Sequence, residues 1–162
     1  MKIRIAGIIN DSIVDGPGLR LTVFTQGCNH NCFGCHNPNT HNLDGGYLIE
    51  CDEIINLVKD NPLLDGITIS GGEPLLQPEP VEYLCKNIKM LGLGVLVYTG
   101  FEYEEVINDR KIISLLENVD ILIDGKFVLE EKSLDLRFRG SKNQRMIDVQ
   151  QSIITNNIVF YK

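Results

Sequence analysis

Short apolar segments alternate with amphipathic segments along most of this chain, and this alternation restricts its fold more than any other feature. The apolar segments have the length of buried strands and lie at residues 19–24, 67–70, 95–98 and 119–123. The segments between them repeat apolar residues with the period of one helix face and lie at 51–59, 79–91 and 102–117. Strands that alternate with helices pair in parallel through right-handed crossovers. The sequence therefore predicts an α/β fold with a mainly parallel sheet.

The remaining segments and the length refine this prediction. Residues 3–9 are expected to add an edge strand, and short strands are expected near 146–149 and 157–161. The chain has 162 residues, a length typical of one domain, so we expect a single domain over residues 1–162. A closed eight-stranded βα barrel typically needs about 250 residues. We therefore predict a partial, open βα barrel, whose open side leaves a groove wide enough for another protein chain.

Charge and hydropathy exclude some classes of function. The chain has 15 basic and 22 acidic residues and a formal net charge of −7, which argues against a nucleic-acid binder that depends on phosphate contacts. No apolar run approaches the roughly 20 residues that span a bilayer. The first residues, 1–5, lack the apolar core of a signal peptide. We therefore expect no nucleic-acid partner, no membrane partner and a cytoplasmic location.

Polar turns that contain glycine follow each of the four predicted strands. These turns are Gln26-Gly27-Cys28, Ser70-Gly71-Gly72-Glu73, Thr99-Gly100 and Asp124-Gly125-Lys126. In parallel α/β folds the functional site lies at the carboxyl ends of the strands, so the four turns are expected to meet at one rim. Turns commonly use glycine for conformational reasons alone. That alternative explains part of the pattern, but it does not explain a group of cysteines at the same rim.

Three of the five cysteines, Cys28, Cys32 and Cys35, are spaced Cys-x3-Cys-x2-Cys in a segment rich in Asn, Gly and Pro, which predicts a loop. An odd number of cysteines argues against a disulfide framework. Thiolates favour zinc or iron–sulfur clusters. A structural zinc site needs four ligands, and a histidine would have to complete it; the candidates are His30, His36 and His41. A 4Fe–4S cluster held by three thiolates would instead keep one iron open for catalysis.

The other two cysteines, Cys51 and Cys85, lie on the apolar faces of predicted helices. A free cysteine behaves as a small buried hydrophobic residue. We therefore expect both to pack in the core rather than to bind metal.

Beyond the cysteines, the chain resembles the radical S-adenosylmethionine (radical SAM) enzymes, and among them the activases of glycyl-radical enzymes. The motifs that carry this resemblance are Asp15-Gly16-Pro17-Gly18-Leu19-Arg20, Gly34-Cys35-His36-Asn37-Pro38 and Ser70-Gly71-Gly72-Glu73-Pro74. Three further segments are similar to activases of anaerobic ribonucleoside-triphosphate reductase; they are Val97-Tyr98-Thr99-Gly100, Ile123-Asp124-Gly125-Lys126-Phe127 and residues 138–145. The resemblance runs from about residue 4 to 149. Gly34 departs from it, because many radical SAM enzymes carry an aromatic residue there, and adenine recognition stays open.

The resemblance implies that Cys28, Cys32 and Cys35 hold a 4Fe–4S cluster whose open iron binds S-adenosylmethionine. Reductive cleavage would give a 5′-deoxyadenosyl radical, which removes a hydrogen atom from a glycine of the reductase large subunit. The implied S-adenosylmethionine-binding residues are Gly34, Cys35, His36, Ser70, Gly71, Gly72, Glu73 and Thr99. A flavodoxin or ferredoxin is the implied electron donor. The cofactors carry the chemistry, so no catalytic side-chain acid or base is expected.

Individual residues within these motifs have expected roles. Gly71 and Gly72 would let the ligand approach the backbone, and Glu73 would accept a hydrogen bond from its amino group or offset the sulfonium charge. The alternative for this motif is a plain Gly-Gly turn with a surface glutamate.

A local basic segment contains Arg137, Arg139, Lys142 and Arg145. It would contact the partner or the cosubstrate carboxylate, or would be a solvated face.

Two other functions remain as alternatives at this point. One is an activase for pyruvate formate-lyase or another glycyl-radical enzyme. The other is a small zinc-binding adaptor without catalysis.

Overall fold

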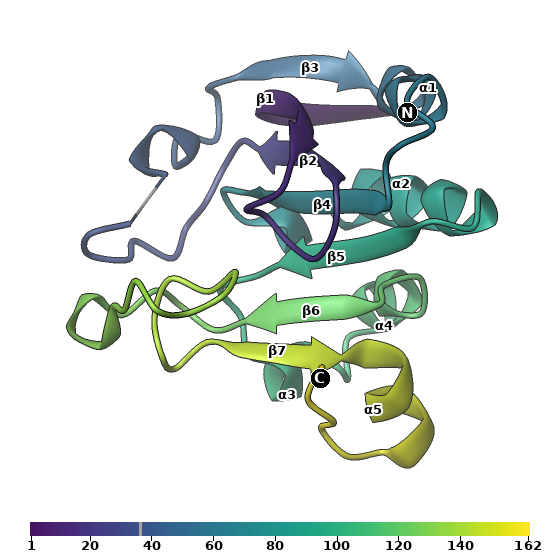
Figure 1. Cartoon of the computed structure of the whole chain (residues 1–162). Coiled ribbons are helices and arrows are strands. Elements are labelled where there is room, and N and C mark those ends of the chain that lie inside the picture. Colours follow the sequence, from purple (N-terminus) through teal and green to yellow (C-terminus); the bar gives the residue numbers. More distant parts are fainter. Residues whose placement is uncertain (36) are drawn as a thin grey trace.

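The computed structural model describes residues 1–35 and 37–162, which form one mixed sheet with helices packed against it. The strand order is β3-β1-β2-β4-β5-β6-β7 (Figure 1). The strands are β1 (Lys2–Ser12), β2 (Arg20–Thr25), β3 (Tyr47–Glu50), β4 (Gly66–Gly71), β5 (Gly94–Tyr98), β6 (Ile121–Asp124) and β7 (Arg145–Asp148). The order leaves two edges, β3 and β7, so the sheet of the described residues is open, as the chain length predicts.

The four central strands, β2, β4, β5 and β6, are parallel to one another, which confirms the predicted mainly parallel sheet. Antiparallel partners flank them: β1 pairs with β2, and β7 pairs with β6. The carboxyl ends of the parallel strands all point to one side of the molecule. Figure 1 shows the long connections 26–46 and 125–144 gathered on that side.

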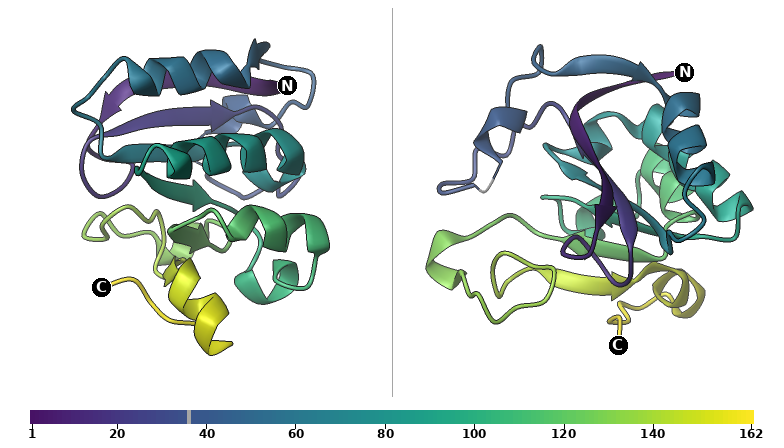
Figure 2. Two further views of the ribbon diagram at one scale, coloured as in Figure 1. Left: turned by 90° about the vertical axis from the view of Figure 1, so that its right-hand side faces the viewer. Right: turned by 45° about the horizontal axis from the view of Figure 1, so that its top comes forward.

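The helices are α1 (Cys51–Lys59), α2 (Pro78–Met90), α3 (Tyr103–Val106), α4 (Arg110–Leu116) and α5 (Val149–Thr155). Short 3-10 turns occur at Pro38–Thr40, Pro74–Leu76 and Leu129–Glu131. Figure 2 shows α1, α2 and α4 side by side over one face of the sheet. No helix in the described part of the chain has both the length and the apolar content to cross a membrane.

Helices α1 and α2 agree with the predicted helical segments to within one residue. Each turns an apolar stripe to the core, and Cys51 and Cys85 lie fully buried within these stripes. The prediction that these two cysteines serve packing is confirmed. Acidic residues in the first turn of each helix and a lysine in the last turn also complement the helix dipole.

Three sequence-based predictions need correction. The segment 102–117 forms two helices, because the Asp109 side chain accepts a hydrogen bond from the backbone N–H of Lys111 and starts α4 anew. Strand β1 is not at the edge, because β3 pairs outside it. The segment 157–161 contributes only an isolated bridge between Phe160 and Ile147. Strand β3 and helix α5 were not predicted.

The two faces of the sheet differ because strand side chains alternate in direction. On β2, Leu21 and Val23 join the core that packs against the helices. Thr22 and Phe24 occupy the alternate positions, on the face away from those helices. Phe24 stands in register with Ser70 of β4, at the carboxyl ends of both strands. The helix-free face therefore carries the residues from which the site is built.

Candidate functional site

A cavity of about 560 Å³ lies at the carboxyl ends of the parallel strands. All four predicted polar turns contribute to its lining, with Cys28, Ser70, Gly71, Gly72, Thr99, Gly100, Gly125 and Lys126. The prediction that these turns meet at one rim is therefore confirmed. Phe24 and Tyr98, the last helix-free-face residues of β2 and β5, also line the cavity.

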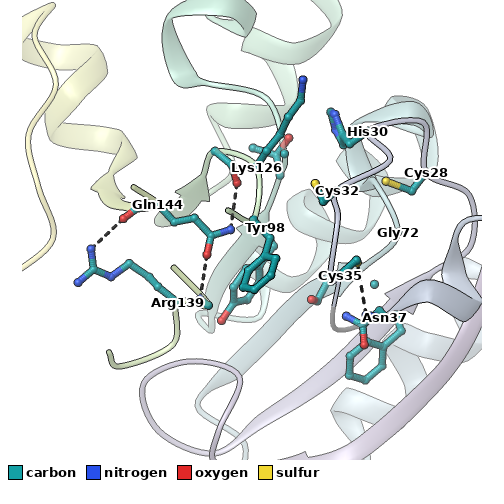
Figure 3. Close-up of a pocket in the computed structure, with 18 of the residues that line it drawn as sticks. Cys28, His30, Cys32, Cys35, Asn37, Gly72, Tyr98, Lys126, Arg139 and Gln144 are labelled. Carbon is teal, nitrogen blue, oxygen red and sulfur yellow. Dashed lines mark hydrogen bonds between the residues drawn. The ribbon is translucent and has the colours of Figure 1, made fainter. Parts of the chain in front are cut away.

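The three clustered cysteines lie on the loop after β2, and all three line the cavity (Figure 3). Each is half-buried and carries a free thiol. Asn31 and Gly34 adopt left-handed backbone angles, with φ of 55° and 74°, and these angles turn the loop sharply between the cysteines. The predicted loop is confirmed, and it presents the thiols to a single space.

The base of this loop is bound to the sheet through the backbone. Gly27 N–H donates to the Thr40 carbonyl at 2.7 Å, and Glu73 N–H donates to the Gly27 carbonyl at 2.7 Å. A Cβ on Gly72 would overlap that Gly27 carbonyl oxygen, and a Cβ on Gly71 would overlap the backbone of Thr25. Both glycines line the cavity, and both also permit a close backbone approach between β4 and the cysteine loop.

Glu73 is 0% exposed, and its carboxylate is enclosed by donors from the protein. Gly100 N–H donates to Oε1 at 2.7 Å, Leu75 N–H donates to Oε2 at 2.9 Å, and the Thr99 hydroxyl lies 3.0 Å from both oxygens. His30 Nε2 lies 2.5 Å from Oε1. The carboxylate is thus satisfied within the fold and does not line the cavity.

The wall opposite the cysteine loop is formed by residues from β5 and from the connection between β6 and β7 (Figure 3). The Tyr98 hydroxyl donates to the Phe138 carbonyl at 2.5 Å, and Arg139 Nη1 donates to the Gln144 carbonyl at 2.8 Å. Arg139 Nε is buried and has no hydrogen-bond partner among the described residues. With Lys126, Arg139 gives this wall two cationic side chains.

The predicted basic segment does not act as one patch. Arg139 lines the cavity. Arg137 lies over the Phe138 ring at 5.1 Å from its centroid. Arg145 is instead held by Asp124 and Glu104 through ion pairs. Within this segment, Arg139 is therefore the arginine placed to contact a ligand in the cavity.

The surroundings of Cys28 affect its proton affinity. Burial raises the pKa of the Cys28 thiol, and Glu73 and the two neighbouring cysteines raise it further. The backbone N–H of His30 opposes this rise through a hydrogen bond. Asn37 N–H similarly donates to Cys35 Sγ at 3.4 Å. A backbone donor is therefore already in place at Cys35, as backbone donors are around metal-bound thiolates.

The sequence-predicted site residues fall into three groups. Those that line the cavity are Cys28, Cys32, Cys35, Ser70, Gly71, Gly72 and Thr99. Gly34 and Glu73 lie beside it without lining it, and His36 lies outside the described residues. Sequence reasoning missed Phe24, Tyr98 and Gln144; the alternation of strand side chains was the available signal for the first two.

The donors in the cavity can be compared with those that a cluster needs. Cys28, Cys32 and Cys35 from one loop line a single cavity, together with His30 and His41. In a 4Fe–4S cluster each thiolate binds a different iron, so the sulfurs surround a space instead of meeting at a point. Three thiols that line one cavity fit this arrangement.

Comparison with known proteins agrees with this geometry. The family model described as a 4Fe-4S single cluster domain matches residues 14–147. The anaerobic ribonucleoside-triphosphate reductase-activating protein of Haemophilus influenzae is 36% identical over 141 residues, covering 82% of this chain and 89% of that protein. The Escherichia coli protein of the same name is also 36% identical, covering 82% of this chain and 90% of its own length.

Of two further matches, one covers a smaller share of the matched protein and the other has much lower sequence identity. The pyruvate formate-lyase-activating enzyme of Clostridium pasteurianum is 39% identical over 127 residues, covering 72% of this chain and 53% of that enzyme. The crystal structure of QueE from Escherichia coli shares the fold, with a TM-score of 0.51 and 13% identity, over 76% of this chain and 71% of that chain. From the cysteine cavity and these relatives together, we conclude that the chain belongs to the family of anaerobic ribonucleoside-triphosphate reductase-activating proteins, with a 4Fe-4S single cluster domain.

Proposed function

We propose that this protein is a radical SAM activase that installs a glycyl radical on the large subunit of an anaerobic ribonucleoside-triphosphate reductase. The observation that carries the proposal is the placement of three thiols from one loop around a cavity at the carboxyl ends of parallel strands. The names of the relatives that match over most of their length support this choice of partner.

In this proposal Cys28, Cys32 and Cys35 hold three irons of a 4Fe–4S cluster. When bound, the cluster supplies the electron that cleaves S-adenosylmethionine to methionine and a 5′-deoxyadenosyl radical. The protein binds and orients the cosubstrate and limits the access of water. Phe24 and Tyr98 provide apolar surface in the cavity for the last of these tasks.

The cosubstrate would bind on the rim beside the cluster. Ser70, Gly71, Gly72 and Thr99 line the cavity at the ends of β4 and β5, and with Cys35 they form the proposed binding surface, together with Gly34 and His36 from the sequence motif. On the opposite wall, Lys126 and Arg139 offer cations for a carboxylate. The Glu73 carboxylate is already engaged by internal donors, which favours a positioning role for it over direct contact.

The cysteines indicate the redox conditions under which this chemistry takes place. All five cysteines are free, and a cluster bound by thiolates suits a reducing compartment, so we place the protein in the cytoplasm. A flavodoxin or ferredoxin would supply the electron.

We treat residues 1–162 as a single activase domain, because the seven strands share one sheet.

Anaerobic reconstitution tests the proposal. The protein should bind about four irons per chain, cleave S-adenosylmethionine to 5′-deoxyadenosine when reduced, and produce a glycine-centred electron spin resonance signal on the reductase. Cys32→Ala should abolish both reactions. Cys85→Ala, which changes a core cysteine away from the cavity, should retain them.

The same experiment separates the alternatives. Cleavage without a radical on the reductase, but with one on pyruvate formate-lyase, would favour the second activase function, which the 39% identical Clostridium pasteurianum relative supports. A colourless protein that binds zinc and leaves S-adenosylmethionine intact would contradict both activase functions.

A further inference from the structure

The side chain of His30 occupies a closely fitted site beneath the cysteine loop. It is only 6% exposed. Its ring packs edge-on against Phe101, with centroids 4.7 Å apart and planes at 75°. A Cβ on Gly100 would lie 2.5 Å from His30 Cδ2, so residue 100 leaves room for the imidazole because it is glycine. Contacts on two sides thus define one position for this ring.

The polar end of the same ring meets the buried Glu73 carboxylate. His30 Nε2 and Glu73 Oε1 are 2.5 Å apart, and Thr99 and Gly100 donate to the same carboxylate. Hydrogen bonds to a charged group are stronger than neutral ones, and a low local dielectric strengthens them further. The imidazole is therefore held by the ends of β4 and β5, through residues distant from it in sequence.

The position of His30 in the chain gives this contact its consequence. His30 lies two residues after Cys28 and two residues before Cys32, so a contact that holds its side chain also restricts the backbone between these two cysteines. Glu73 also holds the base of the loop, because its own N–H donates to the Gly27 carbonyl. Glu73, in the turn that follows β4, thus binds the cysteine loop at Gly27 and at His30, on either side of Cys28.

We propose that the buried His30–Glu73 pair is a tether that fixes the cysteine loop on the sheet and positions Cys28 to receive iron. The inference rests on the proposed function for its cluster, and it makes His30 a positioning residue. The contact engages one of the two ring nitrogens of His30, because Nε2 lies against the Glu73 carboxylate.

Two substitutions at residue 30 separate the hydrogen bond from the volume of the side chain. His30→Gln keeps a donor on a side chain of similar size, whereas His30→Leu fills the site without a donor. Glu73→Gln changes the other partner, and Glu53→Gln, on the exposed surface of α1, is the matched control. If Glu73→Gln does not fold, the two variants at residue 30 provide the test by themselves.

The first measurement is the rate at which the reconstituted protein loses iron to a chelator. Loss of a second-shell partner typically costs 10- to 100-fold in metal affinity, so His30→Leu and Glu73→Gln should lose iron about 10- to 100-fold faster. His30→Gln and Glu53→Gln should stay near the wild-type rate. The effects of His30→Leu and Glu73→Gln should be less than additive in the double variant, because both substitutions remove the His30–Glu73 contact.

The second measurement is hydrogen exchange of the backbone amides of 27–35 in the metal-free protein. Exchange should accelerate in His30→Leu and Glu73→Gln and stay unchanged in His30→Gln. The electron spin resonance spectrum of the reduced cluster should shift in the same two variants. The tether would be refuted if His30→Leu had the iron-loss rate, the amide exchange and the spectrum of the wild-type protein. It would also be refuted if the effects of the two substitutions added up in the double variant.

These outcomes are separable from failure of the proposed function. A wild-type protein that binds the cluster but activates no reductase would refute the proposed function and leave the tether in place. A wild-type protein that activates the reductase, with His30→Leu indistinguishable from it, would refute the tether alone. If the wild type binds no cluster, the role proposed toward iron fails with the proposed function, and amide exchange decides whether the loop is tethered.

Discussion

Arg145 and Asp124 form a two-point ion pair between neighbouring strands. Arg145 Nε lies 3.0 Å from Oδ1 of Asp124, and Nη2 lies 2.5 Å from Oδ2, with the two residues directly in register on β7 and β6. Asp124 is only 1% exposed and also accepts the backbone N–H of Tyr103 at 2.8 Å. The pair therefore sits where β6 ends and the cavity wall at Gly125 begins.

Replacing Arg145 with glutamine should destabilise the fold. Asp124 would remain as a buried carboxylate without its cation, a change that typically costs about 3–5 kcal/mol. Urea unfolding of the metal-free protein measures the loss. Lys142→Gln, in the same basic segment but on the exposed surface, should change the free energy of unfolding by less than about 0.5 kcal/mol. Equal stability of the two variants would contradict a structural role for Arg145.

Thr22 and Thr68 are paired in register on β2 and β4 and should respond oppositely to replacement by valine. The Thr22 hydroxyl is buried without a partner among the described residues, so Thr22→Val should stabilise the protein by about 1 kcal/mol. The Thr68 hydroxyl donates to the Asp15 carbonyl at 2.8 Å and accepts from Arg20 Nε at 2.8 Å. Thr68→Val should therefore cost about 1–3 kcal/mol. Thermal and urea unfolding measure the change in stability of each variant. If both substitutions stabilise the protein, or both destabilise it, the argument is refuted.

Gly72→Ala should loosen the attachment of the cysteine loop. Its new Cβ would overlap the Gly27 carbonyl oxygen, and relief of such overlap typically costs about 1–3 kcal/mol. Iron retention by the reconstituted protein should fall together with stability. Gly7→Ala is the control, because a Cβ on Gly7 meets nothing within 4 Å. If the two alanine variants unfold at the same urea concentration, close backbone packing at Gly72 is not what selects glycine.

The metal-free protein should lose stability as pH rises above about 9. Burial raises the pKa of Cys51 to about 11 and raises the pKa values of Cys85 and Tyr98 above their ordinary 9.0 and 10.0. Above the ordinary values the unfolded chain has lost these protons while the folded chain keeps them, so the free energy of unfolding falls as pH increases. Each group contributes up to about 1.4 kcal/mol per pH unit.

Urea unfolding between pH 8 and pH 11 measures this slope. Cys85→Ala removes one of the groups and should make the slope shallower, even if it lowers stability at every pH. A free energy of unfolding that stays constant over this range would show that the buried groups do not govern alkaline stability.

Local pattern was sufficient for much of the fold. The apolar stripes of α1 and α2 and the short strands β4 and β5 could be read from the sequence because each signal lies within about a dozen residues. Strand β3 was missed because Tyr47 and Leu48 are exposed on a short edge strand and provide little periodic signal. The break between α3 and α4 depended on a single capping contact at Asp109, which a continuous helical pattern concealed.

The sequence by itself determined the class of the fold and the cluster loop, because strand–helix alternation and cysteine spacing are local properties. It also placed Ser70, Thr99 and Lys126 at one rim, since the carboxyl ends of parallel strands must point the same way. Tertiary structure alone decided what Glu73 does. Its carboxylate meets His30, 43 residues away in the chain, and only the packing of β4 and β5 beneath the loop makes that contact. A motif can identify which residues lie at a site, but the direction of a buried side chain is set by all the chain segments that surround it.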